Sequence, residues 1–197
     1  MEQLPYFNKV TLGEVLGKEG ENLNYWIKKL LKNGEIIALK KGLYVSRLYL
    51  LSLTKNLELK ERYLEYLANI IRYPSYISLE YALSKFGVIP ECVYAITSVT
   101  TKTGRIYKNK LGSFIYKSIR DNLFNGFEVF EFENKRIKFA TKAKALFDFL
   151  YFRKSGSLEN IRINWDQFDE NDRQEFKKIV FDSGSYKIKK QLKKLKW

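Results

Sequence analysis

Apolar side chains recur at helical spacing from residue 23 to residue 31, and no other feature constrains the start of the fold as much. The spacings are three, one, three and one positions, among Leu23, Trp26, Ile27, Leu30 and Leu31. Such spacing puts the side chains on one face of an amphipathic helix. We expect Asn33-Gly34 to end this helix, because glycine readily adopts the left-handed conformation that follows a helix C-terminus.

A shorter helix is expected before this one. Thr11 and Glu14 form a capping-box pair, in which each side chain bonds a backbone N–H group at the start of a helix. Gly17 is the expected stop. The apolar face of this short helix is expected to consist of Leu12, Val15 and Leu16.

A β-hairpin is expected after the 23–31 helix. Two runs of strand-forming residues, 35–39 and 43–46, flank Lys40-Lys41-Gly42, where glycine can take a positive φ. Helix, turn, helix and lysine-tipped hairpin follow one another in the order of a winged helix-turn-helix. We therefore predict a winged helix-turn-helix DNA-binding domain at residues 1–50.

The face of the 23–31 helix opposite its apolar side chains carries amides and basic groups. Such groups suit base edges and phosphates in the DNA major groove, and a basic wing suits the phosphate backbone or minor groove. The candidate DNA-contacting residues are Asn22, Asn24, Tyr25, Lys28, Lys29, Lys32, Lys40 and Lys41. The alternative is a helix pair and hairpin that serve only as a scaffold, with solvated lysines.

The remaining residues, 51–197, are predicted to form a larger α+β domain with a mainly antiparallel sheet. Helices are expected at 58–73, 78–86, 140–152, 171–181 and 184–196. The strand-forming runs, rich in β-branched and aromatic residues, are VYAITSVTT, GRIYKNK, SFIYKSI, FEVFEFE and KRIKFA. The predicted fold class is thus α+β, with a winged helix-turn-helix followed by this larger domain.

The net charge of +14 is unevenly distributed. Residues 102–120 and 187–196 carry many basic side chains and no acidic one, which predicts a polyanionic partner. The candidate basic surface of the second domain consists of Lys102, Arg105, Lys108, Lys110, Lys117, Arg120, Lys187, Lys190 and Lys194. The alternative is that these side chains only confer solubility.

Two absences restrict the chemistry. The chain has no histidine, and Cys92 is its single cysteine, which excludes Ser-His-Asp and Cys-His sites, nearly all structural zinc sites and an intramolecular disulfide. Cys92 lies in an apolar stretch and is expected to be a buried small hydrophobe. No P-loop spacing occurs. We expect a protein that is not an enzyme and that needs no cofactor or metal, and, from the absence of a leader or long apolar segment, a cytoplasmic one.

Three further interpretations stay open. Asp121, Glu133 and Lys135 match the D…ExK pattern of a metal-dependent nuclease, although the last two also suit a hairpin turn. Aromatic residues of the basic strands can stack on RNA bases, as Tyr107, Phe114 and Tyr116 would, although alternating aromatics are more often core residues. The basic terminal helix can seek a membrane surface through Ile188, Leu192, Leu195 and Trp197, although this side more often packs on the domain.

Two segments strongly resemble the AbiEi family of antitoxins and virus-defence regulators. The first is YPSYISLEYALSKFGVIPECVYAITSVT at 73–100, which carries in order Pro74, Ser78-Leu79-Glu80, Gly87, Pro90-Glu91 and Thr97-Ser98-Val99-Thr100. The second is KFATKAKALFDFLYF at 138–152, with Lys142-Ala143-Lys144 where relatives usually carry a Pro-Glu-Lys run. The resemblance covers about residues 8–181.

The resemblance implies an N-terminal winged helix that represses its own operon. It also implies a C-terminal domain that counters a nucleotidyltransferase-like toxin in a type IV toxin-antitoxin system, generally without a stable complex between the two proteins. The expected partners are therefore double-stranded operator DNA and, functionally, that toxin. A solitary nucleic-acid-binding regulator is the alternative, and contact of the basic second domain with DNA, RNA or toxin is left open, as is self-association on DNA.

Overall fold

The computed structural model describes residues 4–53, 56–153 and 162–192. The chain divides into two compact units. The first comprises Met1–Leu67 together with Tyr107–Ser113, and the second comprises Ala68–Ile106 and Phe114–Trp197. The predicted division after residue 50 stays a prediction. No helix among the described residues is both long enough and apolar enough to cross a membrane.

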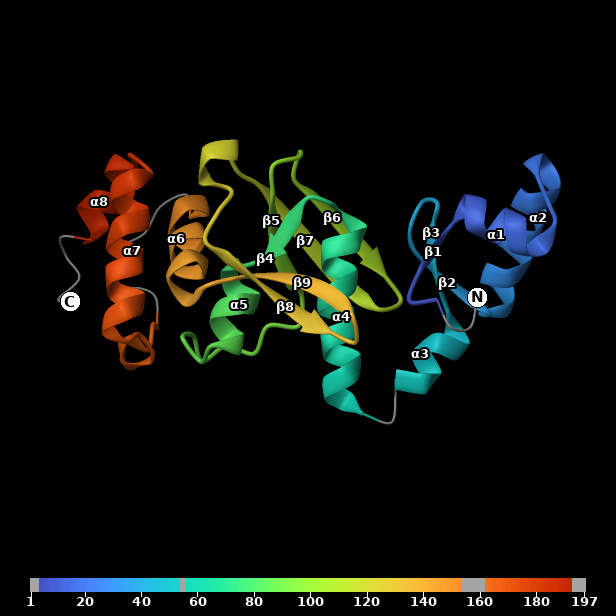
Figure 1. The fold of residues 1–197 in the computed structure, drawn as a ribbon, viewed down its shortest axis with the longest axis horizontal. Helices are drawn as coiled ribbons and strands as arrows, with labels where there is room; N and C mark the ends of the chain where they lie inside the picture. The colour runs from blue at the N-terminus through green and yellow to red at the C-terminus, as the bar shows by residue number, and fades with distance from the viewer. Residues whose placement is uncertain (1–3, 54–55, 154–161, 193–197) are drawn as a thin grey trace. The chain divides into compact units, whose positions relative to one another are not determined.

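The first unit begins with a short strand and two helices (Figure 1). The elements are β1 (Phe7–Asn8), α1 (Lys9–Leu16) and α2 (Gly20–Asn33). The predicted capping box is wrong, because the Asn8 side chain caps α1 by accepting a hydrogen bond of 2.9 Å from the Thr11 backbone N–H. Asn8 lies three residues before Thr11 and satisfies the N–H that the helix start exposes. The predicted stops are confirmed, since Gly17 and Gly34 both follow their helices in the left-handed conformation.

A hairpin and two helices follow α2. The hairpin strands are β2 (Ile36–Lys40) and β3 (Leu43–Ser46), and β1 pairs with the other side of β3, which gives the antiparallel order β1-β3-β2. Helix α3 (Arg47–Leu53) was not predicted, whereas α4 (Leu57–Ile71) fits the predicted apolar stripe. The Asn56 side chain accepts the Glu58 N–H at 2.9 Å and so caps α4.

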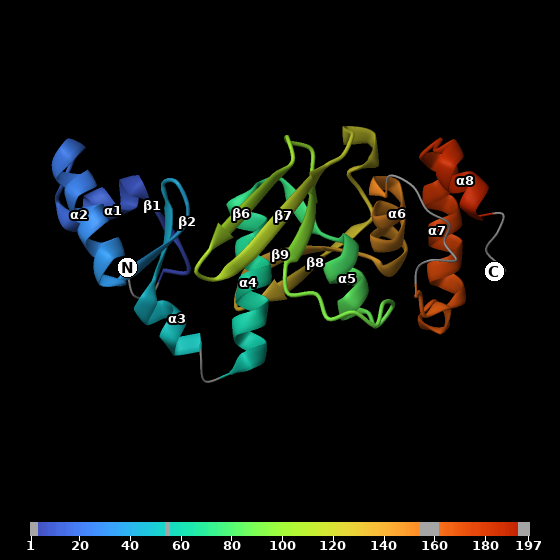
Figure 2. The same ribbon diagram turned by 180° about the vertical axis from the view of Figure 1, so that it is seen from behind.

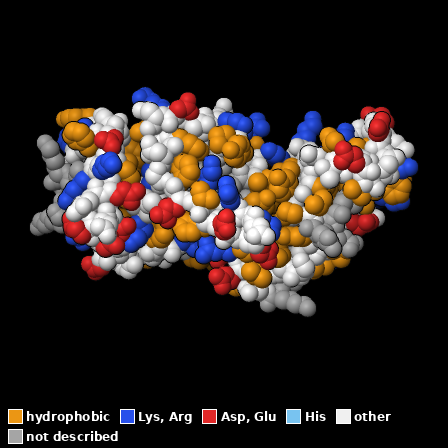
Figure 3. Space-filling model, in the orientation of Figure 1, with side chains coloured by type: hydrophobic (Ala, Val, Ile, Leu, Met, Phe, Trp, Pro, Cys, Tyr) orange, Lys and Arg blue, Asp and Glu red, His pale blue; other side chains and the backbone are white. Residues whose placement is uncertain are grey.

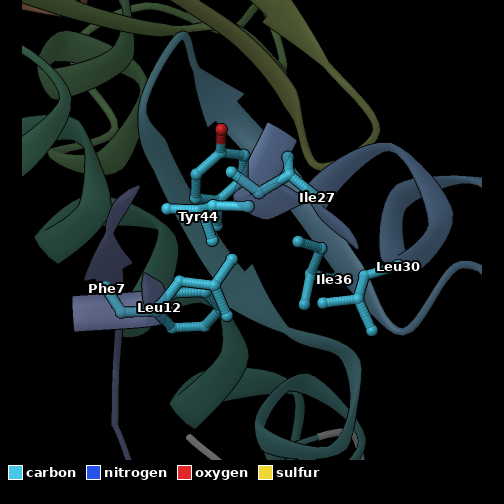
Figure 4. Close-up of a cluster of buried hydrophobic side chains, with 7 residues drawn as sticks. Phe7, Leu12, Ile27, Leu30, Ile36 and Tyr44 are labelled. Atoms are coloured by element: carbon cyan, nitrogen blue, oxygen red, sulfur yellow. The ribbon is translucent and has the colours of Figure 1, made fainter. Parts of the chain in front are cut away.

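The core of the first unit is a cluster of apolar side chains between the helices and the hairpin (Figure 4). The buried members are Phe7, Leu12, Leu23, Ile27, Leu30, Ile36 and Tyr44. The periodicity of α2 therefore predicted its buried face, although Leu31 is only partly buried. Val15 is 55% exposed, so its predicted place on the apolar face of α1 is wrong. The buried residues of the short α1 are Leu12 and Gly13.

The second unit is built on a six-stranded sheet, counted within the described residues, whose strands lie side by side in Figures 1 and 2. Its order is β6-β7-β5-β4-β9-β8. The strands are β4 (Ser75–Ile77), β5 (Ile96–Thr100), β6 (Arg105–Asn109), β7 (Gly112–Ser118), β8 (Phe127–Phe132) and β9 (Lys135–Ala140). The sheet is mixed and mainly antiparallel: β4 pairs antiparallel with β5 and β8 with β9, whereas β5 runs parallel to β7 and β4 parallel to β9. The α+β class is confirmed.

Helices flank this sheet on both faces. Helices α5 (Leu79–Lys85) and α6 (Lys142–Phe152) pack on the sheet and on each other, α7 (Glu170–Asp182) and α8 (Tyr186–Leu192) pack on α6, and the last turn of α4 lies on the opposite face of the sheet. The register pairs Tyr76 with Val99 and Ser98 with Tyr116, so these two tyrosines point to opposite faces of the sheet. The Tyr116 hydroxyl donates to the Ala68 carbonyl in the last turn of α4, whereas the Tyr76 hydroxyl donates to Asp148 of α6. Helices α4 and α6 therefore contact opposite faces of the sheet.

Candidate nucleic-acid interface

Helix α2 presents a basic and aromatic face opposite its buried leucines and isoleucine. Tyr25 is 61% exposed, and the other exposed predicted contact residues of this helix are Asn22, Lys28, Lys29 and Lys32. The Lys29 ammonium lies 4.6 Å from the centre of the Trp26 ring, a cation–π distance that orients the side chain along the helix surface. The chemistry available on this face is positive charge together with donors for phosphate or base-edge oxygens.

Asn24 differs from the other predicted contact residues. It is half-buried, its side-chain oxygen accepts a hydrogen bond of 2.7 Å from Lys9 Nζ, and its amide nitrogen donates to Glu21 at 3.2 Å. Both ends of the amide are thus engaged: the oxygen joins α2 to Lys9 of α1, and the nitrogen bonds Glu21 within α2. A contact between Asn24 and DNA stays a prediction. It would require the Asn24 side chain to give up its hydrogen bonds to Lys9 and Glu21 for bonds to DNA.

Helices α1 and α2 approach each other closely at Gly13. A Cβ atom at this position would lie 3.0 Å from Leu23 Cδ2 and 3.0 Å from the Lys18 carbonyl oxygen, so any larger side chain would push the helices apart. Between them lies a surface hollow of about 780 Å³ whose charged lining residues are Lys9, Glu14, Lys18 and Glu19. This mixture of signs favours neither an anion nor a cation.

The β2–β3 hairpin carries Lys40 and Lys41 next to its turn. Gly42 takes φ +79° there, as expected from the sequence, and its carbonyl accepts the Lys9 N–H at 3.2 Å. This bond ties the hairpin turn to the first residue of α1. Lys41 is exposed and Lys40 is half-buried. The turn, its lysines and the two helices therefore form one connected substructure within the first unit.

The basic stretches from the second half of the chain are less uniform than predicted. Lys102, Arg105, Lys108, Lys110, Lys117 and Arg120 are all exposed. Arg105 and Lys108 point to opposite faces of β6, because side chains alternate along a strand. On the face drawn in Figure 3, Lys and Arg side chains are interspersed with acidic and hydrophobic ones. The stretch at 102–120 therefore does not present its charges in one direction.

The basic residues of α8 also have different surroundings. Lys187 donates its ammonium protons to the carbonyl oxygens of Leu150 and Arg153 at the end of α6, where a cation also stabilises the helix dipole. Lys190 is exposed. Lys194 and the predicted membrane-seeking residues Leu195 and Trp197 lie outside the described residues, as does the side chain of Leu192. Ile188 is completely buried, which contradicts the membrane-surface alternative at this residue and agrees with packing of this side on the domain.

The predicted nucleic-acid stacking residues are mostly part of the core. Phe114 is 1% exposed and Tyr116 is 3% exposed, so neither ring is available to a base, and the core position that the alternating pattern favoured is confirmed for both. Both side chains point to the face of the sheet that contacts the last turn of α4. Tyr107 is half-buried in the middle of β6. The open question of base stacking therefore concerns Tyr107 alone.

The predicted nuclease residues do not form a metal centre. Glu133 and Asn134 take positive φ in the turn between β8 and β9, and Lys135 Nζ donates to the Glu133 carboxylate at 3.0 Å across that turn. Within the described part of the chain, no group of three His, Cys, Asp or Glu side chains is placed to hold a metal ion. Cys92 is exposed in the segment before β5, so its predicted burial is wrong. The apolar neighbours are buried farther along the chain, in the strand itself.

Sequence reasoning missed a buried polar cluster between the sheet and α6. Lys144 Nζ lies 2.8 Å from Asp148 Oδ1 and donates to the Leu123 carbonyl at 2.7 Å. The other carboxylate oxygen accepts hydrogen bonds from Tyr76 at 2.9 Å and from Ser78 at 2.8 Å. Ser78 therefore marks the start of α5, as predicted, but its hydroxyl does not cap that helix.

Burial controls the protonation behaviour of this cluster. It raises the pKa of Asp148, while the Lys144 ammonium and the three hydrogen bonds act in the opposite direction. The pKa of Tyr76 is also raised, first by burial and then by the negative charge of Asp148. The sequence spacing of Lys144 and Asp148 is that of an exposed i,i+4 helix pair, which is why burial was not predicted.

A scan against models of protein families finds no match to this chain, and a search of curated proteins finds no similar sequence.

Proposed function

We propose that the chain is a DNA-binding transcriptional repressor whose first unit acts as a winged helix-turn-helix on double-stranded DNA. One observation carries the proposal. The exposed face of α2 holds Tyr25, Lys28, Lys29 and Lys32, and a hairpin with two lysines at its turn is hydrogen-bonded to α1 of the same unit. In winged helix-turn-helix proteins the second helix enters the major groove while the wing touches the backbone.

The geometry of α2 supports this mode of binding. Its apolar face is fixed in the core through Leu23, Ile27 and Leu30, so the helix is held rigidly while its basic face stays solvated. Lys28 and Lys32 are one helical turn apart and lie on the same side. A rigid element with exposed donors can be placed in a groove at little cost in conformational entropy.

Paired lysine variants test the proposal. Lys28→Ala with Lys29→Ala is expected to abolish the operator shift in a gel assay while the circular dichroism spectrum stays unchanged, because both side chains are exposed. The matched control is Lys177→Ala with Lys178→Ala, two adjacent exposed lysines on α7. Equal loss of DNA affinity in both pairs would reduce recognition to net charge, and unchanged affinity in the folded α2 variant would place recognition elsewhere.

The salt dependence of the DNA affinity measures the electrostatic contribution to binding. If about six phosphates are neutralised, the logarithm of the affinity falls against the logarithm of salt concentration with a slope of about −5. A slope near zero would contradict a phosphate-contacting surface. Operator and random duplex are expected to give similar slopes, because phosphate contacts carry no sequence information.

The resemblance of segments 73–100 and 138–152 to AbiEi antitoxins supports a more specific form of this proposal. In this form the chain represses its own operon and counters a nucleotidyltransferase-like toxin. Bacteria that express such a toxin from the neighbouring gene are expected to stop growing, and co-expression of this chain is expected to restore their growth. The Lys28→Ala, Lys29→Ala variant is expected to lose repression and keep the rescue, since the toxin-countering role is assigned to the second domain. Absence of such a neighbouring gene would favour a solitary regulator.

A further inference from the structure

The turn between β6 and β7 belongs to the first unit, although the two strands extend into the sheet of the second. The segment Tyr107–Ser113 clusters with Met1–Leu67. One contact is specific, because Asn109 Nδ2 donates a hydrogen bond of 3.1 Å to the backbone carbonyl of Leu39 in β2. This bond joins the β6–β7 turn to the strand that ends in the two lysines of the β2–β3 hairpin.

The backbone of β2 is shaped to receive this hydrogen bond. The pairing with β3 shifts register between Ala38 and Lys40, so Leu39 is the extra residue of a β-bulge. Its side chain is buried, and β2 is the edge strand of the order β1-β3-β2. A bulge on an edge strand leaves a carbonyl without a partner in the ladder. Asn109 supplies the missing donor.

Asn109 also fixes the conformation of its own turn. Its side-chain oxygen accepts the Leu111 backbone N–H at 2.8 Å, which is the pattern of an Asx turn. One side chain therefore orders the turn and attaches it to β2. Lys108 and Lys110 flank Asn109 in the sequence, and both are exposed.

The attachment gathers positive charge. Residues 36–46 contain Lys40 and Lys41, residues 107–113 contain Lys108 and Lys110, and neither segment contains an acidic residue. Lys41, Lys108 and Lys110 are exposed, and bringing these three like charges to adjoining turns is unfavourable, even after screening by salt. A polyanion that spans both turns would relieve this repulsion, and the regular phosphates of a duplex provide such a series of charges.

We infer that the β6–β7 turn is a second backbone-contacting element of the DNA interface, in which Lys108 and Lys110 bind phosphates beside those bound by Lys40 and Lys41. This inference rests on the proposed function. Asn109 is the positioning residue, since it holds the two lysines at the β2–β3 hairpin without itself touching DNA. The element adds affinity for duplex DNA of any sequence and does not read bases.

The test measures the salt dependence of duplex binding by the full chain. For Lys108→Ala with Lys110→Ala, the slope is expected to become less negative by about 1.8, which is about 0.9 for each lost phosphate contact, with affinity reduced about tenfold on operator and random duplex alike. The Lys177→Ala, Lys178→Ala pair removes the same charge and is expected to keep the wild-type slope. A wild-type slope in the Lys108, Lys110 variant would overturn the inference.

A second variant separates position from charge. Asn109→Ala keeps all four lysines and is expected to move the slope in the same direction by a smaller amount, because the turn is no longer attached to Leu39. Hydrogen exchange in residues 36–46 verifies that the hairpin remains folded. A wild-type slope in Asn109→Ala would overturn the positioning role. A loss confined to structured RNA, with duplex binding intact in both variants, would overturn the assignment to DNA.

Failure of this inference is distinguishable from failure of the proposed function. If the wild-type chain binds no duplex, or if Lys28→Ala with Lys29→Ala leaves operator binding unchanged, the proposed function fails. If the α2 variant loses operator binding while both β6–β7 turn variants behave as wild type, only the role of the turn fails.

Discussion

The two units of the chain use different interiors. The core of the first unit is apolar and consists of aliphatic and aromatic side chains from α1, α2 and the small sheet (Figure 4). The interior of the second unit contains a fully buried Lys144–Asp148 ion pair together with Tyr76 and Ser78. Lysine side chains of α2 lie on the surface, whereas Lys144 of α6 lies in the core. The same residue type is thus exposed to solvent in one unit and part of the interior in the other.

The difference matters because apolar and charged cores fail in different ways. In an apolar core, the free energy of unfolding changes little when one apolar side chain replaces another of similar volume, and it falls when the volume changes. A buried ion pair contributes little net stability compared with apolar residues, but removal of one partner leaves a charge in a low-dielectric interior. Lys144 also lies 4.8 Å from the centre of the Phe147 ring, so its ammonium is surrounded by the carboxylate, a carbonyl and an aromatic face. The second core depends on specific partners.

The largest expected effect comes from Asp148→Asn. The amide keeps an oxygen that can accept from Tyr76 and Ser78, but it removes the counter-charge of the buried Lys144. We expect a loss of about 3–5 kcal/mol in the free energy of unfolding, measured by urea titration. Hydrogen exchange should assign the loss to the second unit. By comparison, Lys28→Ala with Lys29→Ala should change stability by less than about 0.5 kcal/mol.

A double variant tests whether the charge is the cause. Lys144→Met added to Asp148→Asn removes the uncompensated ammonium and is expected to recover part of the lost stability. If the double variant is less stable than Asp148→Asn alone, the lost hydrogen bonds and packing of the lysine outweigh its charge, and the proposed contrast between the two cores does not hold.

A smaller loss is expected from Gly13→Val in the first unit. The added side chain meets Leu23 and the Lys18 carbonyl oxygen, so α1 and α2 must separate. Overpacking of this kind costs about 1–3 kcal/mol. Val15→Ala, on the exposed side of the same helix, is the matched control and should stay within about 0.5 kcal/mol of wild type. Equal stability of Gly13→Val and wild type would show that the helix contact is not tightly packed.

A loss of about 1 kcal/mol is expected for Asn8→Ala, which removes the cap of α1. The backbone N–H of Thr11 then has no partner, while the apolar core is unchanged. Asn8→Ser is expected to restore most of the stability, because serine is also a favourable cap. If Thr11→Ala costs more than Asn8→Ala, the helix begins where the sequence pattern placed it and not at Lys9.

Local patterns predicted much of the fold. The spacing from Leu23 to Leu30 placed the buried face of α2, and the glycines at 17 and 34 placed two helix ends, because these features depend only on neighbouring residues. The aromatic and β-branched runs gave the positions of β5 to β9. The same periodicity implied that Tyr25 and the lysines of α2 are exposed. Their contact with DNA stays a prediction.

Features that depend on distant residues were not predictable. Strand β4 has only three residues and is defined by its pairing with β5 and β9, which no local pattern indicates. Burial of Lys144 requires Asp148, Tyr76 and the Leu123 carbonyl together. The bond between Asn109 and Leu39 joins residues that are 70 positions apart. A basic stretch in a sequence therefore does not reveal which of its lysines belong to a given unit.

The smallest expected effect concerns Glu175, a half-buried carboxylate of α7 at the margin of the second core. Burial raises its pKa, with a further increase from Asp172 and Glu128, while the hydrogen bond of 2.8 Å from the Thr141 hydroxyl lowers it. Because the folded-state pKa lies above the unfolded one, the folded chain binds more protons between the two values. This group's contribution to stability is therefore present at low pH and lost as pH rises through the folded-state pKa.

Glu175→Gln removes this pH dependence and keeps an oxygen that can accept the Thr141 hydroxyl proton. Relative to wild type, the variant should gain stability as the pH rises from below the unfolded-state pKa of Glu175 through its raised folded-state pKa, by less than about 0.5 kcal/mol, since the half-exposed carboxylate is screened by solvent. Urea titrations at several pH values measure the difference. Glu170→Gln, an exposed carboxylate on the same helix, is the control. An equal gain there would attribute the effect to the net charge of α7 and not to burial of the Glu175 carboxylate.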